Sequence, residues 1–170
     1  MPVLRVVLAA AVIITAVMLE LVVLARWQLP GATPDLLLVV VVALAIARGP
    51  LMGAAAGFAG GLLLDAAPPA AGILGISALV YCIAGYWVGR VAERNDRGPV
   101  LIISSAVLAE IGVVAASAGL AGLLGEDRVA WDEVVGLVLT GALYAAILAS
   151  LVVPLVTSLV RRTEPDYQFR

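Results

Sequence analysis

Six apolar segments, separated by short polar or Pro- and Gly-containing stretches, follow one another along this chain of 170 residues. Each is long enough for four or more helical turns and carries few charges, which predicts a helical membrane protein. We place the helices at about 6–25, 34–48, 51–65, 73–91, 100–124 and 134–160. The chain contains no internal repeat and no second domain, so we expect one all-α bundle of six transmembrane helices over residues 1–170.

The second and third segments are shorter than the others. The second begins at Thr33-Pro34-Asp35, which combines a hydroxyl N-cap, Pro at the first helical position and an acid near the positive end of the helix dipole. At 1.5 Å per residue, segments of this length cover only ~21–23 Å of a hydrocarbon core of ~30 Å. They lie in a locally thinned bilayer, extend by a turn into their loops, or form a hairpin that does not fully cross.

Composition supports the membrane assignment and excludes much chemistry. The chain is 64% hydrophobic and 13% charged, far more apolar than a soluble domain. It contains no His, no Lys and a single Cys, which excludes a Ser-His-Asp triad, a His-ligated metal and a Lys Schiff base. We therefore expect no enzyme activity, no cofactor, no metal and no small-molecule substrate, and the net charge of −2 gives no nucleic-acid-binding surface.

The distribution of arginine predicts the orientation in the membrane. With six spans, eight arginines fall on one side and two on the other. The two are Arg26 and Arg128. Because positive charges favour the cytoplasmic side, we expect a multi-pass membrane protein with both termini in the cytoplasm.

Two acids fall inside the apolar segments. Glu20 lies in the outer half of the first helix and Glu110 near the centre of the fifth. An acid at such depth costs ~2.5–3.5 kcal/mol on insertion scales, so each should face the bundle, a cavity or a partner chain. One interpretation is a proton or ion site. We favour the other, a protonated or hydrogen-bonded packing group, because no second mid-membrane acid lies nearby in the sequence.

Small residues recur along the third helix. They are Gly53, Gly57 and Gly61 at intervals of four, with Gly60 beside them and Asp65 at the same spacing. This spacing puts them on one helix face, which we take as a helix-packing or partner surface.

A polar cluster is expected at the outer ends of the second and third helices. Asp35 and Asp65 should both lie there, with Arg26 nearby as the cation. The simplest role for such a group is a structural salt bridge.

The stretch from Pro34 to Gly75 resembles the MreD family of rod shape-determining proteins. The motifs that carry the resemblance are Pro34-Asp35-Leu36-Leu37-Leu38, Gly49, Gly53-x-x-x-Gly57-Phe58-x-Gly60-Gly61-Leu62-x-x-Asp65 and Gly72-x-Leu74-Gly75. Chain length, six spans and internal termini agree as well, while Glu20 and Glu110 belong to no family motif that we can place.

The resemblance implies a non-enzymatic component of the cell-elongation machinery that works with MreC and the peptidoglycan synthases of lateral wall growth. It also implies a fold similar to the substrate-binding S-components of energy-coupling-factor importers. Such an S-component is therefore the alternative function, although the chain has few mid-helix polar residues to bind a vitamin. An intramembrane enzyme is the least supported function. Hydrolysis requires a nucleophile or activated water held against a second polar group, and the sequence shows no such arrangement.

The arginine bias makes the topology testable. Reporter fusions after Arg97 and after Arg170 are expected to report the cytoplasm, and a fusion at Asp127 the outside. An external position for Arg97 would contradict the six-span arrangement.

Overall fold

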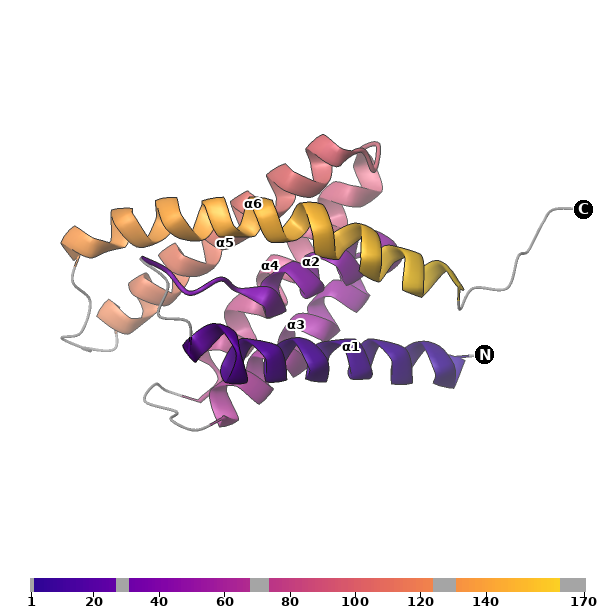
Figure 1. Cartoon of the computed structure of the whole chain (residues 1–170), viewed down its shortest axis with the longest axis horizontal. Coiled ribbons are helices and arrows are strands. Elements are labelled where there is room, and N and C mark those ends of the chain that lie inside the picture. The colour runs from indigo at the N-terminus through magenta and orange to yellow at the C-terminus, as the bar shows by residue number, and fades with distance from the viewer. Residues whose placement is uncertain (1, 27–30, 68–73, 124–130, 163–170) are drawn as a thin grey trace, which may run out of the picture.

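Each of the six apolar segments forms one α-helix in the computed structural model (Figure 1), which confirms the predicted all-helical class. The structure describes residues 2–26, 31–67, 74–123 and 131–162. The helices are α1 (Pro2–Val22), α2 (Leu36–Arg48), α3 (Pro50–Ala66), α4 (Ile76–Arg94), α5 (Pro99–Leu123) and α6 (Trp131–Arg162), with a 3₁₀ turn η1 (Leu24–Arg26) after α1.

Local interactions explain where the observed helix ends differ from the predicted ones. The N-cap of α2 is Asp35 and not Thr33, because the Asp35 side chain accepts a hydrogen bond from the Leu38 N–H at 2.7 Å. The helix α4 continues to Arg94, past the predicted end at residue 91. In this last turn Arg90 forms an ion pair with Glu93 at 3.2 Å, which favours the helix. The Asn95 side chain then donates to the Val91 carbonyl and closes the helix.

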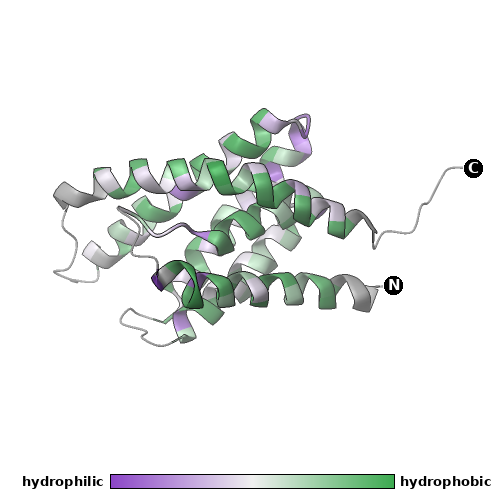
Figure 2. Ribbon diagram, in the orientation of Figure 1, coloured by the Kyte–Doolittle hydropathy of each residue, from purple (hydrophilic) through white to green (hydrophobic). Residues whose placement is uncertain are grey.

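The centre of the bundle is α2. All ten residues of 37–46 are buried, and the helix contacts each of the other five α-helices. A helix that is apolar on every side belongs in the interior of a bundle. This short helix is coloured mostly as hydrophobic in Figure 2, in agreement with the burial of its residues 37–46.

The closest helix pair is α3 and α4, and glycine makes it possible. A Cβ on Gly53 would meet the backbone of Gly85, a Cβ on Gly57 the backbone of Tyr81, and one on Gly61 the backbone of Ala78, all closer than 3.0 Å. Backbones in such contact gain dispersion energy that lipid cannot displace. The glycine face of α3 is thus turned toward α4 of the same chain.

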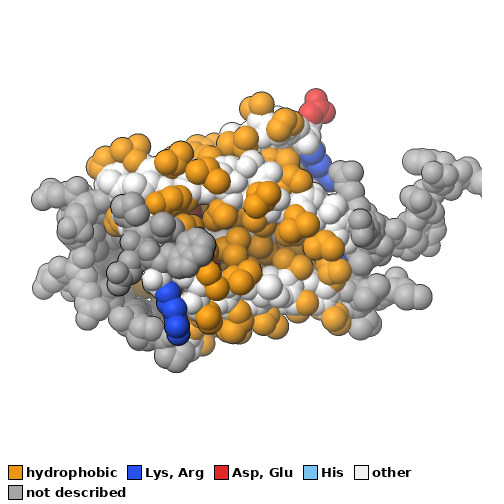
Figure 3. All heavy atoms as spheres, in the orientation of Figure 1, with side chains coloured by type: hydrophobic (Ala, Val, Ile, Leu, Met, Phe, Trp, Pro, Cys, Tyr) orange, Lys and Arg blue, Asp and Glu red, His pale blue; other side chains and the backbone are white. Residues whose placement is uncertain are grey.

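The outside of the bundle is apolar. The space-filling view shows hydrophobic side chains over both α1 and α6 (Figure 3), and large residues such as Leu108, Leu139 and Leu151 are exposed. Among the described residues, two helices are long and apolar enough to cross a membrane, Pro99–Leu120 and Val135–Val160, and each is 28% buried over its apolar stretch. The apolar stretches of α1, α2 and α3 are shorter, at 10–17 residues. This exterior is suited to lipid rather than to water.

The α3–α4 contact can be tested with Gly57→Leu. The new side chain meets the Tyr81 backbone, which cannot move aside as a flexible side chain could, so we expect a destabilisation at or above the upper end of ~1–3 kcal/mol. The measurement is the membrane level and the thermal unfolding temperature in detergent.

The matched control is Gly136→Leu on α6, where no described atom lies within 4 Å of the added Cβ. If both variants had wild-type level and stability, the glycine contact would not hold α3 and α4 together.

Candidate functional site

The start of α2 requires hydrogen-bond acceptors from outside the helix. The first N–H groups of any α-helix have no acceptor within it, and here they lie in the bundle interior. The Leu37 N–H donates to Glu20 Oε2 at 2.9 Å, and the Leu38 N–H donates to Asp35 Oδ1 at 2.7 Å. Glu20 comes from α1, so this arrangement joins the first two helices.

Tyr81 connects α4 to the same point. It is 6% exposed, and its hydroxyl donates to Asp35 Oδ2. A buried tyrosine usually requires such an acceptor. Tyr81 is not among the residues predicted from the sequence, where its one signal is a hydroxyl-bearing ring within an apolar helix.

Glu110 of α5 completes the group. It is 4% exposed, its Oε2 atom has no hydrogen-bond partner among the described residues, and its carboxyl lies beside Gly141 of α6. Glu110 interacts electrostatically with Glu20 and Asp35, which places the three carboxyl groups near one another. We call Glu20, Asp35, Tyr81 and Glu110 the acidic cluster.

The acidic cluster is balanced by the protein backbone. In the described part of the chain, no arginine forms an ion pair with any of its three acids. Those residues also contain no group of three His, Cys, Asp or Glu side chains able to hold a metal ion. The N–H groups and positive dipole end of α2 supply the favourable interactions of Glu20 and Asp35.

The segment that precedes α2 is attached to α6. The Ala32 N–H donates to Thr140 Oγ1 at 2.9 Å, and Gly31 adopts a positive φ of 85°. A Cβ on Gly31 would meet the Thr140 side chain closer than 3.0 Å. With this contact, residues from α1, α2, α4, α5 and α6 all converge around the start of α2.

The expected outer cluster of Arg26, Asp35 and Asp65 is arranged differently. Asp65 accepts hydrogen bonds from the N–H groups of Gly75 at 2.8 Å and Ala78 at 3.3 Å, so it caps the start of α4. Asp35 instead belongs to the acidic cluster. Arg26 is exposed, and the structure shows no ion pair between it and either acid. The two aspartates each cap a helix.

The glycines of α3 face the interior of the chain. Gly53, Gly57 and Gly61 contact α4, as described above, while a Cβ on Gly60 would meet Leu37 of α2 and Ile13 of α1. All four glycines are buried. Their role in the described structure is therefore contact between helices of the same chain.

Comparison with known proteins identifies a family. The model of the family described as rod shape-determining protein MreD matches residues 2–163 of the 170. No curated protein and no solved structure matches the chain.

The role of Glu110 can be tested by two substitutions. Glu110→Gln retains the shape and hydrogen-bonding capacity of a protonated carboxyl, so we expect stability near that of the wild type. Glu110→Arg adds a permanent charge next to the positive end of α2 and more atoms beside Gly141, so we expect a lower membrane level and unfolding temperature.

Glu93→Gln and Glu93→Arg on the exposed end of α4 are the matched controls, since that carboxylate lies outside the cluster. Normal membrane levels with lost function in Glu110→Gln would show that the carboxyl must titrate and is more than a packing group.

Proposed function

Since this chain belongs to the MreD family of rod shape-determining membrane proteins, we propose that it is a non-enzymatic component of the complex that builds the lateral wall during cell elongation. In this proposal it is a multi-pass protein of the bacterial inner membrane with both termini in the cytoplasm. Its partners are an MreC-like membrane protein and the peptidoglycan synthases, for which it serves as a scaffold.

The observation that carries the proposal is the extent of the family match. It covers residues 2–163 and therefore includes all six helices, from Pro2 of α1 to Arg162 of α6. The family determines rod shape, which requires wall synthesis to be organised in the membrane. We therefore expect this membrane protein to bind other membrane proteins.

The arrangement of polar groups supports a scaffold. Glu20, Asp35 and Asp65 accept hydrogen bonds from backbone N–H groups of this chain, and so serve its own helix ends. The exposed apolar side chains of α5 and α6, in contrast, are available to helices of other membrane proteins. A stable interior with an apolar exterior is what a helical scaffold requires.

The family match gives no support to the alternative of an S-component of a vitamin importer. The similarity to the S-component fold remains a prediction. A substrate site would require convergent polar groups around an open pocket, whereas two grooves that the structure contains are lined almost entirely by apolar side chains.

Depletion in a rod-shaped host tests the proposed role. We expect the cells to become round while vitamin uptake stays normal, because the chain supports wall synthesis and does not transport a nutrient. Expression of the wild-type chain should restore the rods, and Gly57→Leu, which disturbs the α3–α4 contact, should not. Rods that persist and acquire a vitamin requirement would contradict the proposal.

Affinity purification from mild detergent tests the partners. An MreC-like protein and peptidoglycan synthases should co-purify with the tagged chain, and an unrelated multi-pass protein of the same host, tagged identically, is the control. Recovery of an importer ATPase in their place would favour the alternative.

A further inference from the structure

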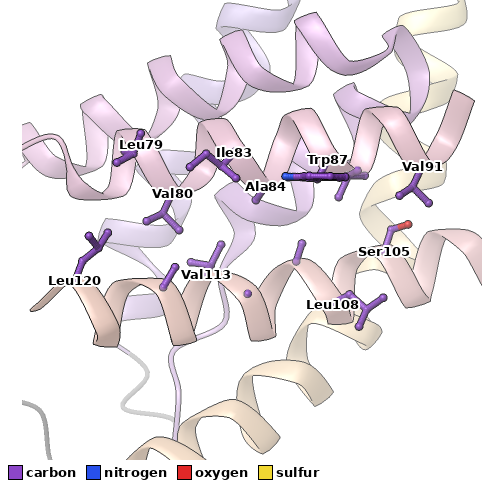
Figure 4. A pocket seen from close by; sticks show the side chains of 14 residues that line it. Leu79, Val80, Ile83, Ala84, Trp87, Val91, Ser105, Leu108, Val113 and Leu120 are labelled. Carbon is purple, nitrogen blue, oxygen red and sulfur yellow. The ribbon is translucent and has the colours of Figure 1, made fainter. Parts of the chain in front are cut away.

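The helices α4 and α5 leave a groove of about 440 Å³ between them (Figure 4). Its α4 wall carries large side chains, among them Ile83 and Trp87, and Trp87 is 63% exposed. Its α5 wall includes small residues such as Gly112 and Ala116. No described atom lies within 4 Å of a Cβ built on Gly112, so this part of the groove is open.

One polar side chain in the groove has no partner. Ser105 of α5 is 6% exposed as a whole residue and makes no hydrogen bond within the described structure. Its neighbour Ser104 behaves differently, because its hydroxyl donates to the Leu101 carbonyl at 3.2 Å. Figure 4 shows Ser105 opposite Val91, with its hydroxyl directed toward α4. The hydroxyl is unpaired and accessible from the groove, so a ligand that brings an acceptor can bind it.

The groove ends beside positive charge. Val91 lines it, and Arg94 follows one turn later on the same face of α4. Arg94 and Arg97 are exposed and form no ion pair in the described structure, whereas Arg90 is paired with Glu93. Asp96 is the remaining acid of this turn, so three arginines and two acids leave a net charge of +1.

The start of α5 adds unpaired donors at the same end. Pro99 has no N–H, and the Gly98 carbonyl accepts from Ile102 at 3.2 Å. The N–H groups of Val100 and Leu101 have no acceptor among the described residues, and Val100 is 80% exposed. Free N–H groups and the positive dipole end of a helix attract an anion.

We propose that this groove binds one molecule of an anionic phospholipid. The phosphate lies at the start of α5 with Arg94 and Arg97, an ester carbonyl accepts a hydrogen bond from Ser105, and an acyl chain follows the groove past Trp87 and Gly112. Ser105 is six residues beyond Pro99, or ~9 Å along the helix axis, so both lie within the length of one lipid molecule. Basic pockets between membrane helices commonly bind anionic headgroups.

The length of the groove favours a lipid chain over a partner helix. Its α4 wall runs from Leu79 to Val91, which corresponds to ~18 Å at 1.5 Å per residue. A single leaflet offers ~15 Å of hydrocarbon, half of the ~30 Å that a crossing helix must span. The groove therefore matches one acyl chain, and a transmembrane helix would extend well beyond it.

Native mass spectrometry tests the proposal on the full chain. The protein is incubated in detergent with equal amounts of phosphatidylglycerol and phosphatidylcholine. We expect one phosphatidylglycerol to be retained in preference to phosphatidylcholine. In the variant with both Arg94→Gln and Arg97→Gln, retention should fall by about fivefold for each charge removed. Arg26→Gln, on an exposed arginine before α2, should leave it unchanged.

Two further variants test the hydroxyl and the groove. Ser105→Ala should weaken retention of both lipids, because both carry ester carbonyls. Gly112→Leu should obstruct the acyl chain, whereas Gly136→Leu on α6, where a Cβ also meets open space, should not. The thermal unfolding temperature identifies any variant that fails to fold.

Three results would overturn the proposal. One is equal retention of the two lipids by the wild type, which indicates lipid bound without selection. Another is an equal loss in Arg26→Gln and in the double arginine variant. The third is a folded Gly112→Leu protein that keeps phosphatidylglycerol but loses a co-purifying membrane protein, which would assign the groove to a partner helix.

Discussion

The structure depends on how the buried start of α2 is satisfied. A helix that begins inside an apolar bundle exposes N–H groups to surroundings that contain no water, and each unpaired group would cost stability. Glu20 of α1 and the N-cap Asp35 accept two of these N–H groups, and Tyr81 of α4 binds the second oxygen of Asp35. These bonds determine where α1 and α4 lie relative to α2.

The remaining helices are placed by packing around this centre. Lipid removes the hydrophobic drive that joins helices in water, so close backbone contact carries more of the association. The glycines of α3 allow that contact with α4, and Asp65 caps the start of α4. The polar groups are thus largely used inside the chain, and the exterior is left apolar for lipid and for protein partners. This division suits a scaffold in a membrane complex.

The sequence predicted the helices well, because long apolar segments give a strong and local signal. It also placed the glycines on one face of α3, since their spacing is local too. It could not show that this face meets α4, or that Glu20, Asp35 and Glu110 come together, because residues so far apart in the chain meet only through tertiary packing. Arg26 was expected to pair with Asp35 and Asp65 because of its charge. In the structure these two aspartates instead accept hydrogen bonds from backbone N–H groups at the starts of α2 and α4.

Hydrogen–deuterium exchange of the purified protein tests the central claim, that a capped and buried α2 supports the bundle. The amides of residues 37–46 are expected to exchange more slowly than those of α1, whose outer face is exposed. Glu20→Ala removes the acceptor of the Leu37 N–H and should accelerate exchange first at the start of α2. Exchange in α2 as fast as in α1, or unchanged exchange at the start of α2 in Glu20→Ala, would contradict the claim.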